Sequence, residues 1–535
     1  MSSDARTLPA GLPATEPSAG LRPRLPRIRE RGLGRELERE ERAALVGAVA
    51  LAGIVTLSLL IVLVAANRPS ILTPTTHIGY FPRWMAGPLG GLLPGFTNDG
   101  TTLKALFTGA IVVMYVGYLV VLKHAARLPA RWIVAAIVAV HAIFLASPPL
   151  ALTDLFNYIN YARMEVVHNL NPYTTIPILE PHSDPSFILS NWHQLLSPYG
   201  PLFTMLTFAL VPLGLAGAFW ALKTILVLSS LAIIWLVWKC AKLLDRDPLV
   251  AIAFVGLNPL VLVWGLGGAH NDFLMVLCLI LGFYLLLLAR SRAGEQPRGE
   301  LSRGELSLRL RALRPRSLRL HELLLPLSPL EMTAGGAFVA AVAIKASAAV
   351  LVPVVLAGMA RWPRAVAQML LGMVLAAVLV GAASLAAFGV HFPDLSTQSS
   401  LVTSESVPNL VGLALGAGGE SSLLRDGVDA LLALALLACC RLAWRKRGSI
   451  TAAGWASVTL VVTLSWVLPW YVLWVLPFAA LTRSRRLRAV ALGLGVYLIM
   501  TWVPVSGGLW KAIGFHPEKT PLGRHHQQYV RQLLD

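Results

Sequence analysis

The chain has 535 residues, 56% of them hydrophobic, and a mean hydropathy of +0.67. Several apolar runs exceed the roughly 18 residues that cross a bilayer as a helix, and because they are continuous rather than alternating they exclude a transmembrane barrel. A net charge of +18 could indicate a nucleic-acid partner, but the basic residues gather in loops beside the apolar runs, as the positive-inside rule expects. We therefore predict an all-α, polytopic membrane protein with no nucleic-acid partner.

The N-terminal part of the chain sets the predicted topology. Residues 1–43 hold nine arginines and seven acids without apolar periodicity, which predicts a disordered basic cytoplasmic tail. The apolar run at 44–66 is too long for a cleaved signal peptide. Further runs at 103–122 and 132–150 then place the segment 151–200 outside the cytoplasm, and this segment has almost no Lys or Arg.

The rest of the apolar region, which we place at 44–510, is less regular. An arginine-rich loop at 290–331 is predicted to be cytoplasmic. Two apolar stretches, 333–358 and 451–481, have basic flanks at both ends, so each is either one span or a hairpin of two short helices. Counting such segments, we expect about 11–14 transmembrane or re-entrant helices, followed by an extracytoplasmic polar tail at 511–535.

Polar side chains collect in the predicted outer loop. Asp154 directly follows an apolar run, where partial desolvation would suit a general base, although an aspartate there could equally cap the next helix. Tyr158 shares a helical face with Asp154. Arg163 is the only basic side chain of the loop besides histidine; it suits a phosphate, or an ion pair with Glu165.

Two further polar groups interrupt apolar runs. His270, Asn271 and Asp272 follow two glycines and form a compact polar tip, which fits a sugar, a metal or a helix cap. Lys345 lies in the run AVAIKASAAVLVP, where a cation is costly without an anionic partner or water. The hairpin interpretation places Lys345 at one tip and Trp470 at the other, on the side of Asp154.

These motifs together resemble a known enzyme group. DLFNYINYAR, NPY, SPYGPL, LNPLVLVWGLGGAHND, an intramembrane lysine before Pro353, and LPWYVLWVLP occur in this order. They resemble the GT-C glycosyltransferases, and more narrowly the bacterial polyprenol-phosphomannose-dependent alpha-1,6-mannosyltransferases that extend lipomannan-type glycans. The resemblance covers about residues 44–510.

The resemblance implies a multi-pass enzyme of the plasma membrane whose site lies on the extracytoplasmic face. It implies a polyprenyl-phosphate sugar donor, a glycan or glycolipid acceptor, surrounding membrane lipids and inversion at the sugar. Asp154 would be the general base. Lys345, Arg163 and His270 would bind the donor phosphate. The residues expected to position sugar are Tyr158, Asn171, Tyr173, Tyr199, Asn271, Asp272 and Trp470.

One departure leaves metal use open, so a divalent metal stays among the expectations. Many GT-C enzymes carry two acidic residues in the first outer loop, whereas Thr153–Asp154 supplies one; Asp272 or Glu165 could be the second in space. The alternatives are transfer of another polyprenyl-linked sugar, such as arabinose or glucose, and a lipid or sugar transporter. A transporter should place its polar groups near the bilayer midplane, within reach of both sides.

Overall fold

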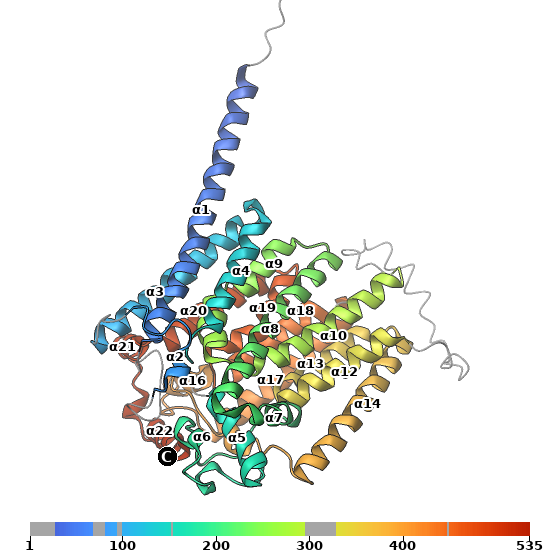
Figure 1. The fold of residues 1–535 in the computed structure, drawn as a ribbon. Coiled ribbons are helices and arrows are strands. Elements are labelled where there is room, and N and C mark those ends of the chain that lie inside the picture. The colour runs from blue at the N-terminus through green and yellow to red at the C-terminus, as the bar shows by residue number, and fades with distance from the viewer. Residues whose placement is uncertain are drawn as a thin grey trace, which may run out of the picture.

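The computed structural model describes residues 27–67, 81–93, 99–150, 154–294, 328–446 and 449–534, with side chains from Glu40 onward apart from Lys446. Throughout these residues the regular structure is helical, with no strand, which confirms the predicted all-α fold (Figure 1). The α-helices are α1 Arg27–Ala65, α2 Arg83–Ala86, α3 Gly100–His124, α4 Ala130–Leu145, α5 Asp154–His168, α6 Pro185–Leu189, α7 Pro201–Phe208, α8 Gly214–Leu243, α9 Pro248–Gly256, α10 Asp272–Arg292, α12 Pro329–Ile344, α13 Leu351–Met359, α14 Pro363–Phe388, α15 Ser396–Ser399, α16 Val407–Ala414, α17 Ser422–Lys446, α18 Ser449–Thr463, α19 Leu476–Leu481, α20 Arg485–Trp502, α21 Ser506–Ala512 and α22 Pro521–Leu534. Tighter or wider turns are η1 Ala125–Arg127, η2 Pro177–Leu179, η3 Val211–Leu213, η4 Val261–Leu266, η6 Ala346–Val350, η7 Pro469–Trp474 and η8 Pro517–Lys519.

Long and short apolar helices both build the membrane domain. Among the described residues, six helical segments are long and apolar enough to cross a membrane, and α20 with α21 forms a further pair bent by 97°. Five apolar helices of 10–17 residues accompany them. The sequence-based estimate of 11–14 transmembrane or re-entrant helices counted both the long and the short apolar helices. The long spans are Glu40–Ala65, Gly100–Arg127, Pro201–Leu243, Asp272–Arg292, Pro363–Phe388 and Ser422–Arg445.

The N-terminal tail is only partly where the sequence placed it. Residues 1–26 lie outside the described residues, as does 295–327 of the arginine-rich loop. The prediction of disorder is wrong for residues 27–43, which are helical and continuous with the first span. Arg, Glu and Leu dominate this segment and are strong helix formers, so it extends the helix that the apolar run begins.

The stretch 333–358 is a hairpin, as one of the two sequence interpretations proposed. A Cβ on Gly335 would lie 2.0 Å from the Met369 carbonyl oxygen, so α12 and α14 pack closely near their N-terminal ends. Since α13 ends at Met359, directly before α14, both flanks of the stretch lie at one end of the bundle. Lys345 stands at the break between α12 and η6, in an extended conformation (φ −152°, ψ 120°).

The stretch 451–481 is a second hairpin. The hydroxyl oxygens of Thr451, at the start of α18, and Thr482, just after α19, lie 2.7 Å apart. The helix breaks after Thr463, and Pro469, which cannot donate a backbone hydrogen bond, begins η7. The hairpin therefore carries the predicted Trp470 segment at its tip.

The C-terminal polar residues fold against the segments that carry Gln194 and Glu420 rather than trailing away. The Gln194 amide donates to the Leu533 carbonyl at 3.1 Å, and His526 Nε2 lies 3.1 Å from the Glu420 carbonyl. Figure 1 shows α22 close to α6, at the end of the molecule opposite the start of α1. The tail predicted at 511–535 thus includes a packed helix.

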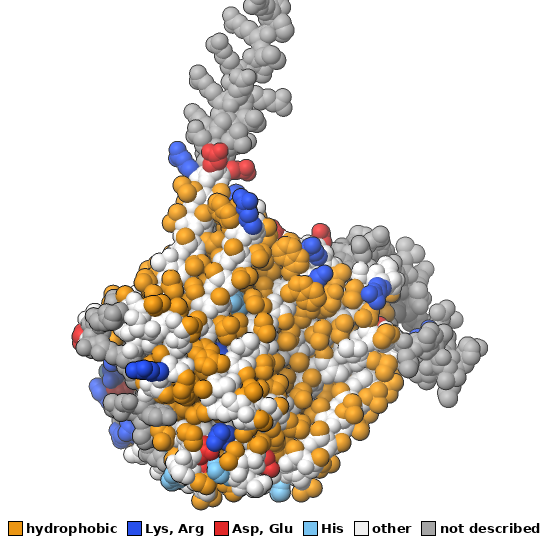
Figure 2. Space-filling view, in the orientation of Figure 1, with side chains coloured by type: hydrophobic (Ala, Val, Ile, Leu, Met, Phe, Trp, Pro, Cys, Tyr) orange, Lys and Arg blue, Asp and Glu red, His pale blue; other side chains and the backbone are white. Residues whose placement is uncertain are grey.

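Helix α8 connects the two ends of the domain. Phe156 of α5 stacks on Phe219, near the N-terminal end of α8, with ring centroids 5.6 Å apart. Lys239 and Lys242 lie at the other end of α8. Figure 2 shows a broad band of hydrophobic side chains over the flank that includes α14, with Lys and Arg above and below it. The polar α5 segment and the basic α8 turn are therefore at opposite ends.

Candidate active site

Asp154 and His270 form the centre of the candidate site. Asp154 opens α5, where a carboxylate is favoured by the positive end of the helix dipole. Its Oδ2 lies 3.3 Å from His270 Nδ1. The His270 side chain is 1% exposed and that of Asp154 is 18% exposed, so the carboxylate is the member of the pair that solvent reaches.

The chain conformation around His270 requires small residues. A Cβ on Gly268 would lie 2.4 Å from His270 Nε2, so only glycine lets the imidazole fold back over the turn. The Leu150 amide donates to the Gly267 carbonyl at 2.9 Å. This bond ties the connection leading to Asp154 directly to the turn that carries His270.

Asp272 organises the opposite side of the site. Lys345 Nζ donates to both of its carboxylate oxygens at 2.9 Å. Trp470 Nε1 donates at 3.1 Å and Trp474 Nε1 at 2.6 Å. The side chain of Asp272 is 1% exposed and that of Lys345 is 20% exposed. Asp272, predicted to contact sugar, therefore has its oxygens engaged by a lysine and two indoles.

Aromatic rings join the two halves of the site. Trp470 lies flat on His270, with ring centroids 3.4 Å apart and planes 7° from parallel. The backbone amide of Asn271 donates to the Tyr158 hydroxyl at 3.4 Å. Tyr158 packs edge-on against Tyr199, with ring centroids 4.6 Å apart. Burial, followed by the nearby charges of Asp154 and Asp272, raises the pKa of the Tyr158 phenol well above its usual value, so it stays protonated.

Several buried polar atoms at this centre have no hydrogen-bond partner within the described part of the chain. These are both ring nitrogens of His270, although Nδ1 lies near Asp154, and the side-chain oxygen and nitrogen of Asn271. Buried polar groups are nearly always paired. A hydroxyl-rich ligand would supply the missing partners.

Arg163 has a different neighbourhood from the one predicted. Its Nε and Nη2 donate to Asp184 at 2.9 and 2.8 Å, and His168 Nε2 lies 2.8 Å from the same carboxylate. Although burial acts in the opposite direction, hydrogen bonds from Arg163, the Ser186 amide and His168 hold the pKa of Asp184 below its ordinary range. Arg163 stands about 14 Å along α5 from Asp154.

The two remaining sugar candidates shape the loop. Asn171 donates to the Phe388 carbonyl at 2.9 Å and accepts from the Tyr173 amide at 3.0 Å. The Tyr173 hydroxyl donates to the Tyr199 carbonyl at 2.8 Å. These bonds hold the NPY segment against α14 and against the Tyr199 segment of the site.

Sequence reasoning missed two residues. Trp474 belongs to the same LPWYVLWVLP run as Trp470, and nothing in that run distinguishes it from the apolar residues around it. Lys223 is a lysine inside the apolar run of α8, which is the same signal that identified Lys345, and it lies fully buried beside the connection to Asp154.

The arrangement of the acidic side chains does not decide whether the enzyme uses a divalent metal. In the described part of the chain no three His, Cys, Asp or Glu side chains gather as a metal site. Glu165, one candidate for a second carboxylate, stands about three helical turns from Asp154. Asp272, the other, is bound by Lys345.

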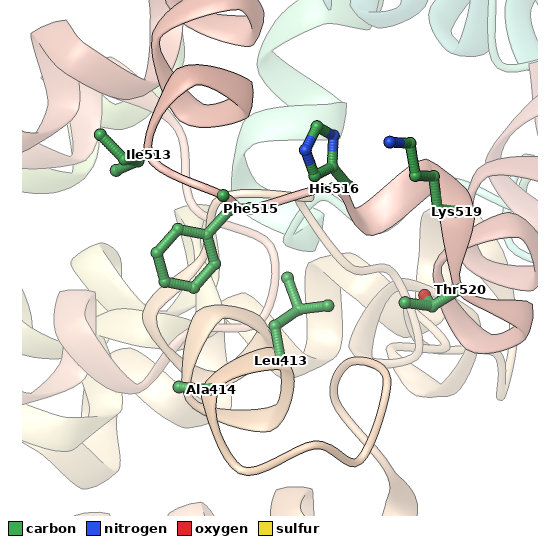
Figure 3. A pocket seen from close by; sticks show the side chains of 8 residues that line it. Leu413, Ala414, Ile513, Phe515, His516, Lys519 and Thr520 are labelled. Atoms are coloured by element: carbon green, nitrogen blue, oxygen red, sulfur yellow. The ribbon is translucent and has the colours of Figure 1, made fainter.

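Two cavities lie at the same end of the molecule as α5 and α22. One, of 330 Å³, has mainly apolar walls from α12 and α14, includes Gly200 and Phe392, and reaches Ala346, the neighbour of Lys345. The other, of 410 Å³, lies between the end of α16 and the α21–α22 connection, with Phe515, His516 and Lys519 on its wall (Figure 3). The first is the one beside the candidate site.

Comparison with known proteins identifies the family of the chain. The profile of the family described as "Alpha-(1->6)-mannopyranosyltransferase, N-terminal domain" matches residues 70–361, and that of the "MptB C-terminal domain" matches residues 405–515. Alpha-(1->6)-mannopyranosyltransferase A of Mycobacterium tuberculosis is 27% identical over 404 residues, 69% of each chain. A second alpha-(1->6)-mannopyranosyltransferase of that organism is 24% identical over 407 residues, 68% of each chain. No solved structure matches. The chain thus belongs to the alpha-(1->6)-mannopyranosyltransferase family and is a multi-pass membrane mannosyltransferase.

Proposed function

We propose that this mannosyltransferase takes mannose from a polyprenyl-phosphate donor and transfers it with inversion to a hydroxyl of a growing mannan or lipoglycan, forming alpha-1,6 links. The observation that carries the proposal is the Asp154–His270 centre, where an accessible carboxylate adjoins buried polar atoms that lack partners. Family membership supplies the sugar and the linkage class. The site lies among apolar helices long enough to cross a membrane, and a donor with a lipid chain can reach it from the bilayer.

Asp154 is assigned as the general base. Its carboxylate accepts the proton of the acceptor hydroxyl as that oxygen bonds to the anomeric carbon, and the bond from that carbon to the phosphate oxygen breaks. Polyprenyl phosphate leaves with the electron pair. Attack opposite the leaving group inverts the sugar. The side chain of Asp154 is 18% exposed, so an acceptor hydroxyl can approach the carboxylate.

Lys345 is assigned to the leaving phosphate. The bond to Asp272 fixes its ammonium group in place, while the side chain stays 20% exposed. Fixed cations aimed at a developing charge act most strongly where water is excluded. His270 lies between Asp154 and Trp470 and is a second phosphate candidate. Arg163 stays a weaker prediction because Asp184 already occupies its guanidinium.

The apolar cavity beside Lys345 is assigned to the first isoprene units of the donor. Its walls come from α12 and α14, and it ends at Ala346, next to the proposed phosphate ligand. A carbon chain in this cavity would place its phosphate at Lys345. The side chains for the sugar are then those nearest Asp154, namely Asn271, Tyr158, Tyr199 and Trp470.

The site is proposed to face the outside of the plasma membrane. The α5 segment and the basic turn after α8 lie at opposite ends of one 30-residue helix. Basic loops favour the cytoplasm. Cysteine labelling near Arg246 and near His182 in intact cells should therefore report opposite faces, with His182 accessible from outside.

Asp154→Asn tests the catalytic assignment. We expect transfer of labelled mannose from polyprenyl-phosphate mannose to an alpha-mannoside to fall at least about 100-fold, with normal insertion into membranes. Asp99→Asn is the matched control, because Asp99 also begins a helix and is exposed. Wild-type transfer by Asp154→Asn would remove Asp154 as base. A parallel screen with arabinose and glucose donors tests the sugar.

A further inference from the structure

Lys223 is a buried lysine whose position the proposed reaction does not explain. It lies in α8 with 0% exposure. Its ammonium group donates to the Ser147 carbonyl and, at 2.8 Å, to the Ser147 hydroxyl. Trp220 and Phe219 flank it, with ring centroids 5.4 and 5.9 Å away. No carboxylate pairs with Lys223 among the described ion pairs.

The partners of Lys223 are at the end of a helix. α4 ends at Leu145, and Ser147 follows it with its amide bonded to the Phe144 carbonyl. Carbonyl groups at and just after a helix C-terminus lack a partner within the helix and need a hydrogen-bond donor from elsewhere. Lys223 therefore closes the end of α4 from the neighbouring helix α8.

The segment that Lys223 holds leads directly to the candidate base. Three residues after Ser147, the Leu150 amide donates to Gly267, in the turn that carries His270. On the far side of Asp154, Phe156 stacks on Phe219, one helical turn from Lys223. The Ser147–Leu150 segment is thus fixed by α8 at one point and by the His270 turn at another.

We propose that Lys223 is a positioning residue for the transfer reaction. By holding the Ser147–Leu150 connection against α8, it sets the place of Asp154 opposite His270. The proposal rests on the proposed function, because it takes the Asp154–His270 centre to be the reacting one. It assigns Lys223 no contact with donor or acceptor.

Lys223→Met tests the proposal, because methionine fills similar space without the amine that donates to Ser147. We expect kcat to fall about 10–100-fold, the scale of a misplaced catalytic group, while KM for polyprenyl-phosphate mannose stays within about twofold. The matched control is Lys242→Met, in the same helix, where the lysine is exposed and lies over Trp238. Unchanged kcat in Lys223→Met would overturn the proposal.

A double-mutant cycle separates positioning from a general structural role. If Lys223 acts through the Asp154–His270 pair, adding Lys223→Met to His270→Ala should cost far less than it costs in the wild type. Additive losses would overturn the proposal. Should Lys223→Met fail to fold, Ser147→Ala removes only the hydroxyl partner and should lower kcat in the same direction; unchanged kcat there would overturn it too.

Failure of the two proposals is distinguishable. Full activity of Asp154→Asn would remove the proposed base whatever Lys223 does. An inactive Asp154→Asn combined with a fully active Lys223→Met would remove only the role of Lys223.

Discussion

Lys345 and Asp272 are bonded through both carboxylate oxygens at 2.9 Å, although 73 positions separate them in the chain. The pair joins the tip of the α12 hairpin to the start of α10. Two indoles from a third segment complete the coordination of the carboxylate. Lys345 therefore has a structural task as well as its proposed task at the phosphate, and the two can be separated by mutation.

Lys345→Met should destabilise the protein by about 3–5 kcal/mol, because it leaves the Asp272 charge buried and uncompensated. Lys345→Met combined with Asp272→Asn should recover most of that loss, since the Asn oxygen can still accept from an indole. Transfer should stay low in the double variant, because the phosphate has lost its cation. Thermal unfolding and mannose transfer measure the two effects, and wild-type transfer by the double variant would exclude Lys345 as a phosphate ligand.

Trp470→Phe should separate the hydrogen bond of Trp470 from its stacking. Phenylalanine can keep a flat face on His270 but cannot donate to Asp272, so we expect a loss of about 1.5–3 kcal/mol in the free energy of unfolding. Trp470→Ala removes the aromatic face as well and should raise KM for the acceptor above that of Trp470→Phe. Trp474→Phe, which removes only the second indole donor, is the control; an equal rise in KM in all three variants would contradict a stacking role.

Arg163→Gln should act on stability rather than on donor binding. Its guanidinium is bound to Asp184, whose side chain is 2% exposed, so breaking the pair should cost about 3 kcal/mol. Arg163→Lys keeps the charge but not the planar guanidinium group, so it should retain only part of the stability that Arg163→Gln loses. A raised KM for the donor at unchanged thermal stability would instead return Arg163 to the phosphate site.

Glu180 should make stability depend on pH near neutrality. It is 4% exposed, and burial raises its pKa to about 7 although Asn160 acts in the opposite direction. Because the folded state disfavours the ionised form, stability falls as pH rises from about 4.5 to 7 and is level above that. Glu180→Gln should therefore raise the melting temperature at pH 8 but not at pH 4.5. An equal rise at both would show that packing, not ionisation, is the cause.

Much of the fold follows from hydropathy and charge. The long spans appear as continuous apolar runs. Basic flanks at both ends of the two short stretches left a single span and a hairpin open, and both stretches are hairpins. The helical part of the N-terminal tail could not be predicted in this way, because its charged residues favour a helix only when a neighbouring span continues it.

The candidate site was less accessible to sequence reasoning. Topology placed Asp154, His270, Lys345 and Trp470 on one side, and the structure brings them together. Which partner each takes depends on packing: the sequence paired Arg163 with Glu165 or a phosphate, whereas the loop folds so that Asp184 reaches it. The partners of Asp272 come from segments about 70 and 200 residues away, beyond any local pattern.

The same distances have a consequence for how the protein is made. At a synthesis rate of roughly 5–20 residues per second, Lys345 is made roughly 4–15 s after Asp272, and the two indoles follow after nearly three times that interval. During that interval the growing chain carries an acid without its final partners. The site is completed only after η7 emerges, so a chain truncated before it would contain the base and yet lack a finished centre. Insertase and chaperone contacts with the nascent α10 segment are where such waiting would be detected.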